Sequence, residues 1–127
     1  MADQSTSVDT MTYDEPGDLA AVRAFVRTNA VALGLTHQRA DLLTLAVSEL
    51  TTNTLQHTAG GGRVRVWAEG AQVVCEVRDN GAPPGFGEMP APESPRGRGL
   101  AIVGRVADEV ATLSDDGGTV TRIKMNR

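Results

Sequence analysis

The first regular feature of the chain is a segment whose apolar residues recur at three- and four-residue steps, the period of a helix with one buried face. These residues are Leu19, Val22, Val26, Ala30 and Leu33. Asp18 precedes them and suits an N-cap, while Gly34 follows them as a terminator. Thr36 is the next candidate N-cap, so the pattern predicts a second, longer helix directly after a short turn.

The second helix carries polar residues on its apolar side. At about 100° per residue, an apolar arc is formed by Leu42, Leu43, Leu45, Ala46 and Leu50. Glu49, Asn53 and His57 recur at four-residue steps inside that arc. Burying an ionised carboxylate is costly, so Glu49 is expected to face a cavity, with Asn53 offering an oxygen to a cation or a water on the same wall. The helix alone leaves open that both are satisfied groups of an ordinary core, and His57 is favoured as a cap or packing group over a metal ligand.

Two alternating segments follow this helix and predict a β-hairpin. Glycines at 60–62 stop the helix and permit a tight reversal. Residues 63–69 and 72–79 then alternate between apolar and polar side chains, with a short turn between them. The two-residue period places Asp79 on the inner face, at the end of the second strand.

A long irregular segment and a glycine motif come next. Residues 82–96 contain five of the six prolines and show neither the helical nor the strand period of apolar residues. Such a segment is typical of a functional lid or, alternatively, of an unimportant surface insertion. Gly97, Arg98, Gly99 and Leu100 then open a third predicted helix. Glycines let backbone N–H groups approach an anion, and a helix N-terminus adds a favourable dipole. The motif therefore predicts a phosphate site, although Gly-x-Gly before a helix is weak evidence alone.

The chain is predicted to close with two strands, residues 110–114 and 119–125, joined by the turn-forming run 115–118. Thr119 lies on the inner face of the last strand under the two-residue period. A threonine there can hydrogen-bond a ligand, and it can equally be an ordinary β-branched strand residue.

Length and composition limit the classes of function. The 127 residues suit one domain, placed at residues 14–127, with residues 1–13 as a flexible tail or edge strand. A net charge of −4 with scattered signs and an aromatic content of 3% argue against direct nucleic-acid binding. The single cysteine, Cys75, is interpreted as a core residue. No run of about 18 apolar residues and no signal-peptide pattern occurs, so a cytoplasmic location and no membrane contact are expected.

The order of the motifs is more restrictive than any one of them. A helix with Glu-x-x-x-Asn, a strand ending in Asp-x-Gly, a lid, Gly-x-Gly-Leu on a helix and a final Gly-Thr follow one another. In this order of motifs the sequence resembles the GHKL superfamily of ATP-binding domains. Within it, the sequence is most similar to the small anti-sigma-factor serine kinases of bacterial stress and sporulation switches. The resemblance covers about residues 14–125. The resemblance implies the Bergerat fold, an α/β two-layer sandwich in which helices cover one face of a mixed, mostly antiparallel sheet.

The resemblance also implies roles for the residues around the adenine and the metal. Glu49 would be the general base that polarises the attacking hydroxyl or water, and Asn53 would hold the Mg²⁺ that bridges the phosphates of ATP. Asp79 would accept a hydrogen bond from the adenine amino group. Gly81 would let the base lie against the backbone, and Thr119 would reach the adenine side.

At the phosphates, the resemblance implies a backbone cradle made by Gly97, Gly99 and the N–H of Leu100, with Arg98 adding positive charge. Two features depart from the family pattern. Pro83 stands where the family often has the last glycine of Asp-x-Gly-x-Gly, and the lid lacks a lysine. Both bear on lid closure and phosphotransfer more than on adenine binding.

The function implied by the resemblance is that of an ATP-dependent serine/threonine kinase that regulates transcription through protein partners. It would bind a sigma factor and phosphorylate a serine of an anti-anti-sigma antagonist of the STAS type. Homodimerisation through the N-terminal strand and first helix is a further implication. The alternative is a non-catalytic adaptor that uses ATP to set its shape, whereas a histidine-kinase fragment is less favoured because no phosphoacceptor helix pair precedes the domain.

Overall fold

Five strands and two long helices form the part of the chain that the computed structural model describes, residues 8–57, 61–79, 107–115 and 118–127. The helices are α1 (Leu19–Ala32) and α2 (His37–His57), preceded by a short 3₁₀ turn, η2 (Pro16–Asp18). The strands are β1 (Asp9–Tyr13), β2 (Gly62–Glu69), β3 (Gln72–Asp79), β4 (Glu109–Asp115) and β5 (Gly118–Asn126).

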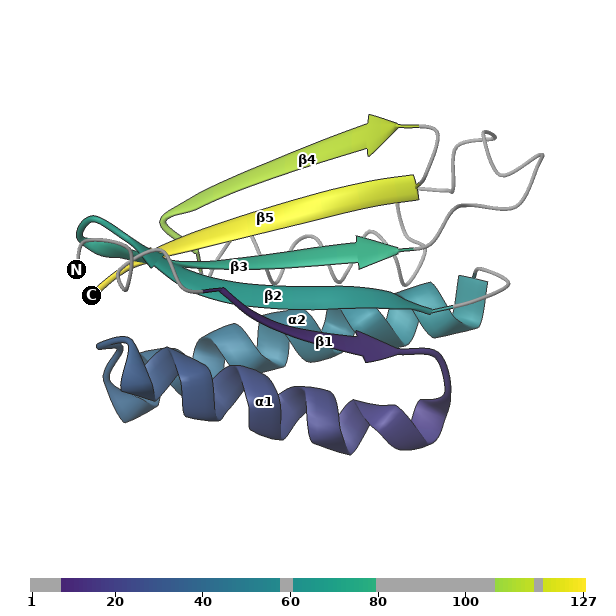
Figure 1. Cartoon of the computed structure of the whole chain (residues 1–127), viewed down its shortest axis with the longest axis horizontal. Coiled ribbons are helices and arrows are strands. Elements are labelled where there is room, and N and C mark those ends of the chain that lie inside the picture. The colour runs from purple at the N-terminus through teal and green to yellow at the C-terminus, as the bar shows by residue number, and fades with distance from the viewer. Residues whose placement is uncertain (1–7, 58–60, 80–106, 116–117) are drawn as a thin grey trace.

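The strands make one sheet in the order β1-β2-β3-β5-β4, and each described pairing is antiparallel. Both helices pack on the same face of this sheet (Figure 1). The two-layer α/β architecture predicted from the sequence is therefore confirmed. Within the described ranges the opposite face carries no helix, and neither α1 nor α2 is long and apolar enough to span a bilayer.

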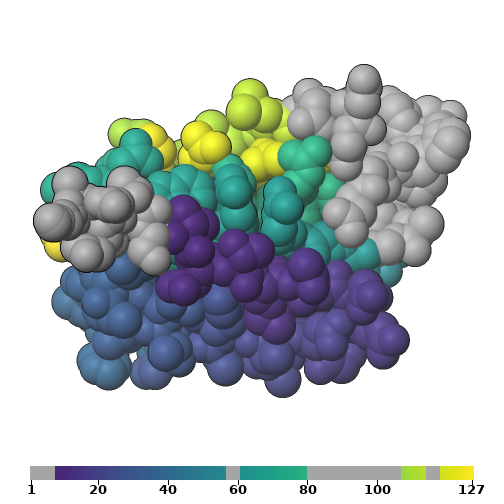
Figure 2. All heavy atoms as spheres, in the orientation of Figure 1, coloured from purple at the N-terminus to yellow at the C-terminus, as the bar shows by residue number. Residues whose placement is uncertain are grey.

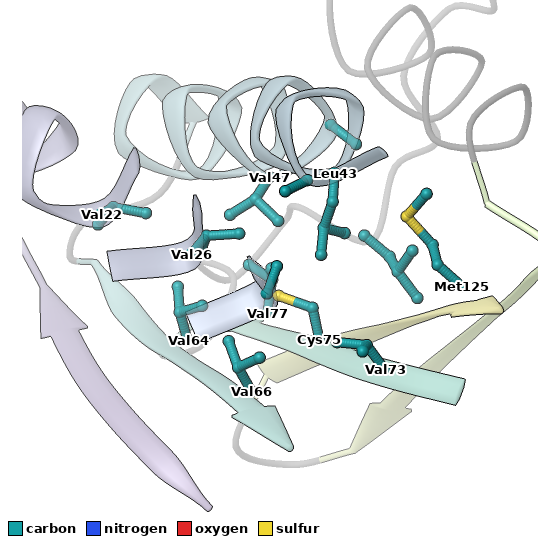
Figure 3. Packing of buried hydrophobic residues seen from close by; sticks show 14 of the residues in the cluster. Val22, Val26, Leu43, Val47, Val64, Val66, Val73, Cys75, Val77 and Met125 are labelled. Atoms are coloured by element: carbon teal, nitrogen blue, oxygen red, sulfur yellow. The ribbon is translucent and has the colours of Figure 1, made fainter. Parts of the chain in front are cut away.

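The hydrophobic core fills the space between the helices and the inner face of the sheet (Figure 3). Residues at every second position of the strands point into it, as the two-residue period requires. Its members include Val22, Val26, Leu43, Val47, Val64, Val66, Val73, Cys75, Val77 and Met125. Cys75 is fully buried, and burial raises the pKa of its thiol, as does the neighbouring charge of Glu76. Its interpretation as a core residue is confirmed.

The first helix begins differently from the expectation that Asp18 caps it. Oδ2 of Asp18 accepts hydrogen bonds from the backbone N–H groups of Asp14 (3.0 Å) and Glu15 (3.1 Å), and makes none with α1. The reason is that η2 runs directly into α1, so Asp18 already has a helical backbone (φ −78°, ψ −14°) and its carboxylate points back along the chain. The same two bonds hold the pKa of Asp18 below its usual value.

The other helix signals are confirmed. The helix α1 ends just before Gly34, whose φ of +116° lies in the region that favours glycine. The hydroxyl of Thr36 accepts a 3.1 Å hydrogen bond from the backbone N–H of Arg39 and thus caps α2.

The apolar arc of α2 is rotated relative to the sequence prediction. Leu42 and Leu45 were placed in the core but are 39% and 47% exposed, whereas Leu43 and Val47 are fully buried. Packing against the sheet and α1, rather than the densest run of leucines, determines which side of the helix is covered. As a result Glu49 lies at the border of the buried arc, where it is partly exposed.

Candidate functional site

One end of the inner sheet face brings together residues from three strands. Tyr13 pairs with Gly62, and Gly62 pairs with Asp79, so a row runs across β1, β2 and β3. The middle position of this row has no side chain. Tyr13 and Asp79 are therefore neighbours across a glycine.

The glycines at the start of β2 are required by the close approach of backbones. A Cβ on Gly61 would lie 1.7 Å from the carbonyl oxygen of Tyr13, and one on Gly62 would lie 1.7 Å from the carbonyl oxygen of Arg78. The sequence indicated only a helix stop and a reversal here. Their larger role is to let β1 and β3 close tightly on β2.

Asp79 ends β3 with its side chain on the inner face, where the two-residue period put it. It is only 6% exposed, and its Oδ1 accepts a 2.9 Å hydrogen bond from the backbone N–H of Thr119. This bond joins the end of β3 to the beginning of β5. The structure thus brings together two of the residues that the sequence analysis singled out.

Tyr13 is a site residue that the sequence analysis missed. It is 2% exposed, and its hydroxyl makes no hydrogen bond of ordinary geometry. Burial raises its pKa to about 12, an effect partly offset by the hydroxyl of Thr54 and reinforced by the negative charge of Asp79. Tyr13 is the chain's single tyrosine and occupies an inner-face position, but its partner across Gly62 depends on strand pairing that local patterns do not contain.

The helix α2 reaches the same end of the sheet. Thr54 lies near enough to Tyr13 to lower the pKa of its hydroxyl. The residue before it, Asn53, is 7% exposed. One turn earlier, Glu49 keeps partial access to solvent. The amide and the carboxylate thus lie on the last turns of α2, which approach the row that ends at Asp79.

The remaining predicted site residues lie outside the described residues. These are Gly81, the lid at residues 82–96, and Gly97, Arg98, Gly99 and Leu100. The side chain of His57 is also outside them.

The donor set suits a hard cation. Among the described residues, no group of three or more His, Cys, Asp or Glu side chains could hold a metal ion. Asn53 offers an amide oxygen, and Mg²⁺ is commonly held by one or two protein oxygens while waters and phosphate oxygens complete its shell. The amide oxygen of Asn53 is therefore compatible in its chemistry with a magnesium ion.

The sequence matches a known family of domains over most of its length. Residues 13–125 match the family model of the histidine kinase-like ATPase domain, and the chain belongs to this family. This is the GHKL group with the Bergerat fold, as the resemblance in the sequence implied.

Among solved structures, the chain is similar to the RsbU and RsbW domains of Rv1364c from Mycobacterium tuberculosis. The TM-score is 0.73 and the identity 21%, over 94% of this chain and 32% of that one. This chain thus spans about a third of the length of its neighbour, and at this identity the likeness shows the fold. No curated protein sequence matches the chain significantly.

Proposed function

We propose that this domain binds Mg-ATP and transfers the terminal phosphoryl group to a serine of a protein partner. The observation that carries the proposal is the buried carboxylate of Asp79, fixed by the N–H of Thr119 beside the last turns of α2. In a member of the ATPase family, such a carboxylate is well suited to read the adenine base.

At the base, Asp79 supplies an acceptor for the amino group of adenine. A carboxylate attracts an amino group and repels a carbonyl oxygen, so guanine is disfavoured. A hydrogen bond to a charged group contributes about 1.5–3 kcal/mol. Thr119 holds one oxygen of the carboxylate in place, and Gly81, outside the described residues, would let the base lie against the backbone.

At the phosphates, phosphoryl transfer asks mainly for positioning and neutralisation of charge. Asn53 would hold Mg²⁺, which supplies that neutralisation when bound. Glu49 would accept the proton of the attacking serine hydroxyl, and its partial exposure leaves it accessible to a partner's side chain. The Gly97 to Leu100 motif would cradle the phosphates with its backbone N–H groups.

The biological role that we propose is that of an anti-sigma factor in the bacterial cytoplasm. The domain would bind a sigma factor and phosphorylate a serine on an anti-anti-sigma antagonist. Support comes from the order of motifs in the sequence and from the fold shared with a structure that contains an RsbW domain.

The Glu49→Ala variant separates this kinase from an adaptor that only binds ATP. We expect ATP binding, followed by calorimetry, to survive within about threefold, while transfer of labelled phosphate to the antagonist falls by roughly a hundredfold or more. Glu109 is an exposed glutamate on β4, so Glu109→Ala is the matched control. This variant should retain both ATP binding and phosphate transfer. If the unmutated protein binds Mg-ATP but transfers no phosphate to its cognate antagonist, the adaptor function replaces the kinase.

A further inference from the structure

The phenolic hydroxyl of Tyr13 is a group that the fold buries at a cost in free energy. Tyr13 is 2% exposed and belongs to the hydrophobic core cluster, yet its oxygen makes no hydrogen bond of ordinary geometry in the described structure. A buried hydroxyl without a partner loses its hydrogen bonds to water and gains none in return. A phenylalanine would fill the same space without that loss. The hydroxyl therefore requires an explanation other than packing.

The strand that carries Tyr13 could have left this hydroxyl in water. Tyr13 is the last residue of β1, which lies at one edge of the sheet. Figure 2 shows atoms of β1 at the molecular surface, between those of α1 and those of β2. Thr10 and Thr12 lie on the outer face of this strand and are exposed. Tyr13 lies on the alternate, inner face, which directs its polar end into the domain.

The carboxylate of Asp79 is one polar group close to the Tyr13 hydroxyl. Both residues lie on the inner face in one row across the sheet, with only Gly62 between them. Neighbouring strands are about 4.8 Å apart, so the two Cα atoms are separated by roughly 10 Å, and the glycine leaves the space above it open to the tyrosine side chain. The charge of Asp79 is near enough to contribute to the raised pKa of Tyr13.

Thr54, on the last turns of α2, is a second polar neighbour of the Tyr13 hydroxyl. Its own hydroxyl donates a 3.0 Å hydrogen bond to the carbonyl oxygen of Leu50, so its single proton is already used. Towards Tyr13 it is therefore a neutral acceptor. Hydrogen bonds to an ionised group are roughly twice as strong as neutral ones. Asp79 is thus the better partner for the phenolic proton.

The carboxylate of Asp79 can accept from more than one donor. Its Oδ1 accepts a 2.9 Å hydrogen bond from the backbone N–H of Thr119, on β5. A carboxylate has about four acceptor positions on its two oxygens, so a donor on β1 does not compete with one on β5. Hydrogen bonds at a binding site are often poorly aligned in the free protein and tighten when the ligand is bound. The neighbouring hydroxyl of Tyr13 is suited to such a bond.

We propose that Tyr13 is a positioning residue for nucleotide binding: when ATP is bound, its hydroxyl donates a hydrogen bond to the carboxylate of Asp79 and holds that carboxylate against the amino group of adenine. This inference rests on the proposed function, in which Asp79 reads the base. The hydroxyl lacks a good partner in the free domain and gains one in the complex, so the new bond adds to the affinity for ATP.

Tyr13→Phe tests the inference at neutral pH, because it removes the hydroxyl and keeps the ring. We expect calorimetric titration to show an affinity for ATP lower by roughly fivefold. The melting temperature of the free variant should not fall, since no ordinary hydrogen bond is lost. A defect in packing would instead lower the melting temperature together with the affinity. The two measurements therefore separate positioning of the carboxylate from support of the core.

Thr12→Val is the matched control. It removes a hydroxyl from the adjacent residue of the same strand, whose exposed side chain lies on the outer face. We expect this variant to bind ATP with unchanged affinity.

A double-mutant cycle identifies the group through which Tyr13 acts. If that group is the carboxylate of Asp79, removing the phenolic hydroxyl in an Asp79→Asn background should change the affinity for ATP by less than about twofold. Kinetics give an independent measurement. Tyr13→Phe should raise the KM for ATP by the same factor as the calorimetric change and leave kcat within about twofold, because Glu49 and Asn53 are unchanged.

The possible failures differ from one another. Equal affinity of Tyr13→Phe and the unmutated protein for ATP would overturn this inference and leave the assignment of Asp79 intact. A similar loss in the Asp79→Asn background would show that the hydroxyl acts on another group such as Thr54, and a lower melting temperature at neutral pH would show a packing role; each would overturn the inference. If the unmutated protein did not bind ATP, the proposed function would fail, and this inference with it.

Discussion

The backbone N–H of Thr119 donates a 2.9 Å hydrogen bond to Oδ1 of Asp79. This bond is made between main chain and side chain, so replacing Thr119 would leave its donor in place, whereas replacing Asp79 changes the acceptor. The carboxylate is oriented by the sheet before any ligand arrives. Preorganisation of this kind favours specific recognition, because little conformational freedom remains to be lost on binding.

Asp79→Asn should weaken ATP binding by roughly ten- to a hundredfold, the equivalent of about 1.5–3 kcal/mol for a charge-assisted hydrogen bond. The amide oxygen can still accept from Thr119, which leaves the amide NH₂ facing the amino group of adenine. Calorimetric titration with ATP measures the effect, and circular dichroism checks the fold. An unchanged affinity would contradict the adenine assignment.

The location of Asp79 could be predicted because it depends on a local rule. Alternation along β3 determines its face, and the glycine that follows marks the end of the strand. The cap at Thr36 and the terminator at Gly34 are equally local. Each signal is contained within a few neighbouring residues.

What the sequence did not reveal depends on contacts between distant segments. The rotation of α2 that exposes Leu42 and Leu45 is determined by packing on the sheet and on α1. The pairing of Tyr13 with Gly62 joins residues far apart in the chain. Likewise, the pairing of Glu76 with Arg65 and Arg122 exists only after strand register has aligned β2, β3 and β5.

Gly61→Ala should destabilise the domain by about 3 kcal/mol or more and weaken ATP binding with it. The new Cβ would lie 1.7 Å from the carbonyl oxygen of Tyr13, so β1 would have to move away from β2. Such overpacking against backbone cannot be relieved by a rotamer change. Thermal unfolding measures the loss.

Gly17→Ala is the matched control, because nothing lies within 4 Å of a Cβ at that position. We expect it to change stability by no more than about 0.5 kcal/mol. If Gly61→Ala were tolerated equally well, the close approach of β1 would not be a requirement of the fold.

Tyr13 should make the domain sensitive to alkali. Its pKa is raised from 10.0 to about 12 in the folded state, so the unfolded chain releases the phenolic proton first as pH rises. The stability that the neutral phenol provides is complete below pH 10 and decreases through the interval up to about pH 12. The shift corresponds to a loss on the order of 2–3 kcal/mol.

Tyr13→Phe removes this titration. The variant should unfold less readily than the unmutated protein between pH 10 and 12, and near neutral pH it should be about equally stable because the hydroxyl makes no ordinary hydrogen bond. Urea unfolding at several pH values measures both. If the stability of the two proteins decreased equally at high pH, a group other than Tyr13 would be responsible for the sensitivity to alkali.

Glu76, on the sheet face opposite the helices, should make the stability of the domain sensitive to acid. Its folded-state pKa lies below the ordinary value of 4.5, so the unfolded chain takes up a proton first as pH falls. The stabilisation is complete above that ordinary value and is lost as pH decreases through the folded-state pKa. Because its two partners, Arg65 and Arg122, are more than a third exposed, solvent screening limits the contribution to about 1 kcal/mol or less.

Glu76→Gln should remove this contribution, because an amide leaves the charges of Arg65 and Arg122 without an anion between them. Near neutral pH the variant should be less stable, and its stability should decline less than that of the unmutated protein as the solution is acidified. Glu69→Gln is the matched control, since that side chain is 55% exposed and lies 3.9 Å from its cation, Lys124. Denaturant unfolding from neutral to acidic pH measures all three proteins. Equal acid sensitivity of the two variants would mean that the arginine pair does not depend on Glu76 for its neutralisation.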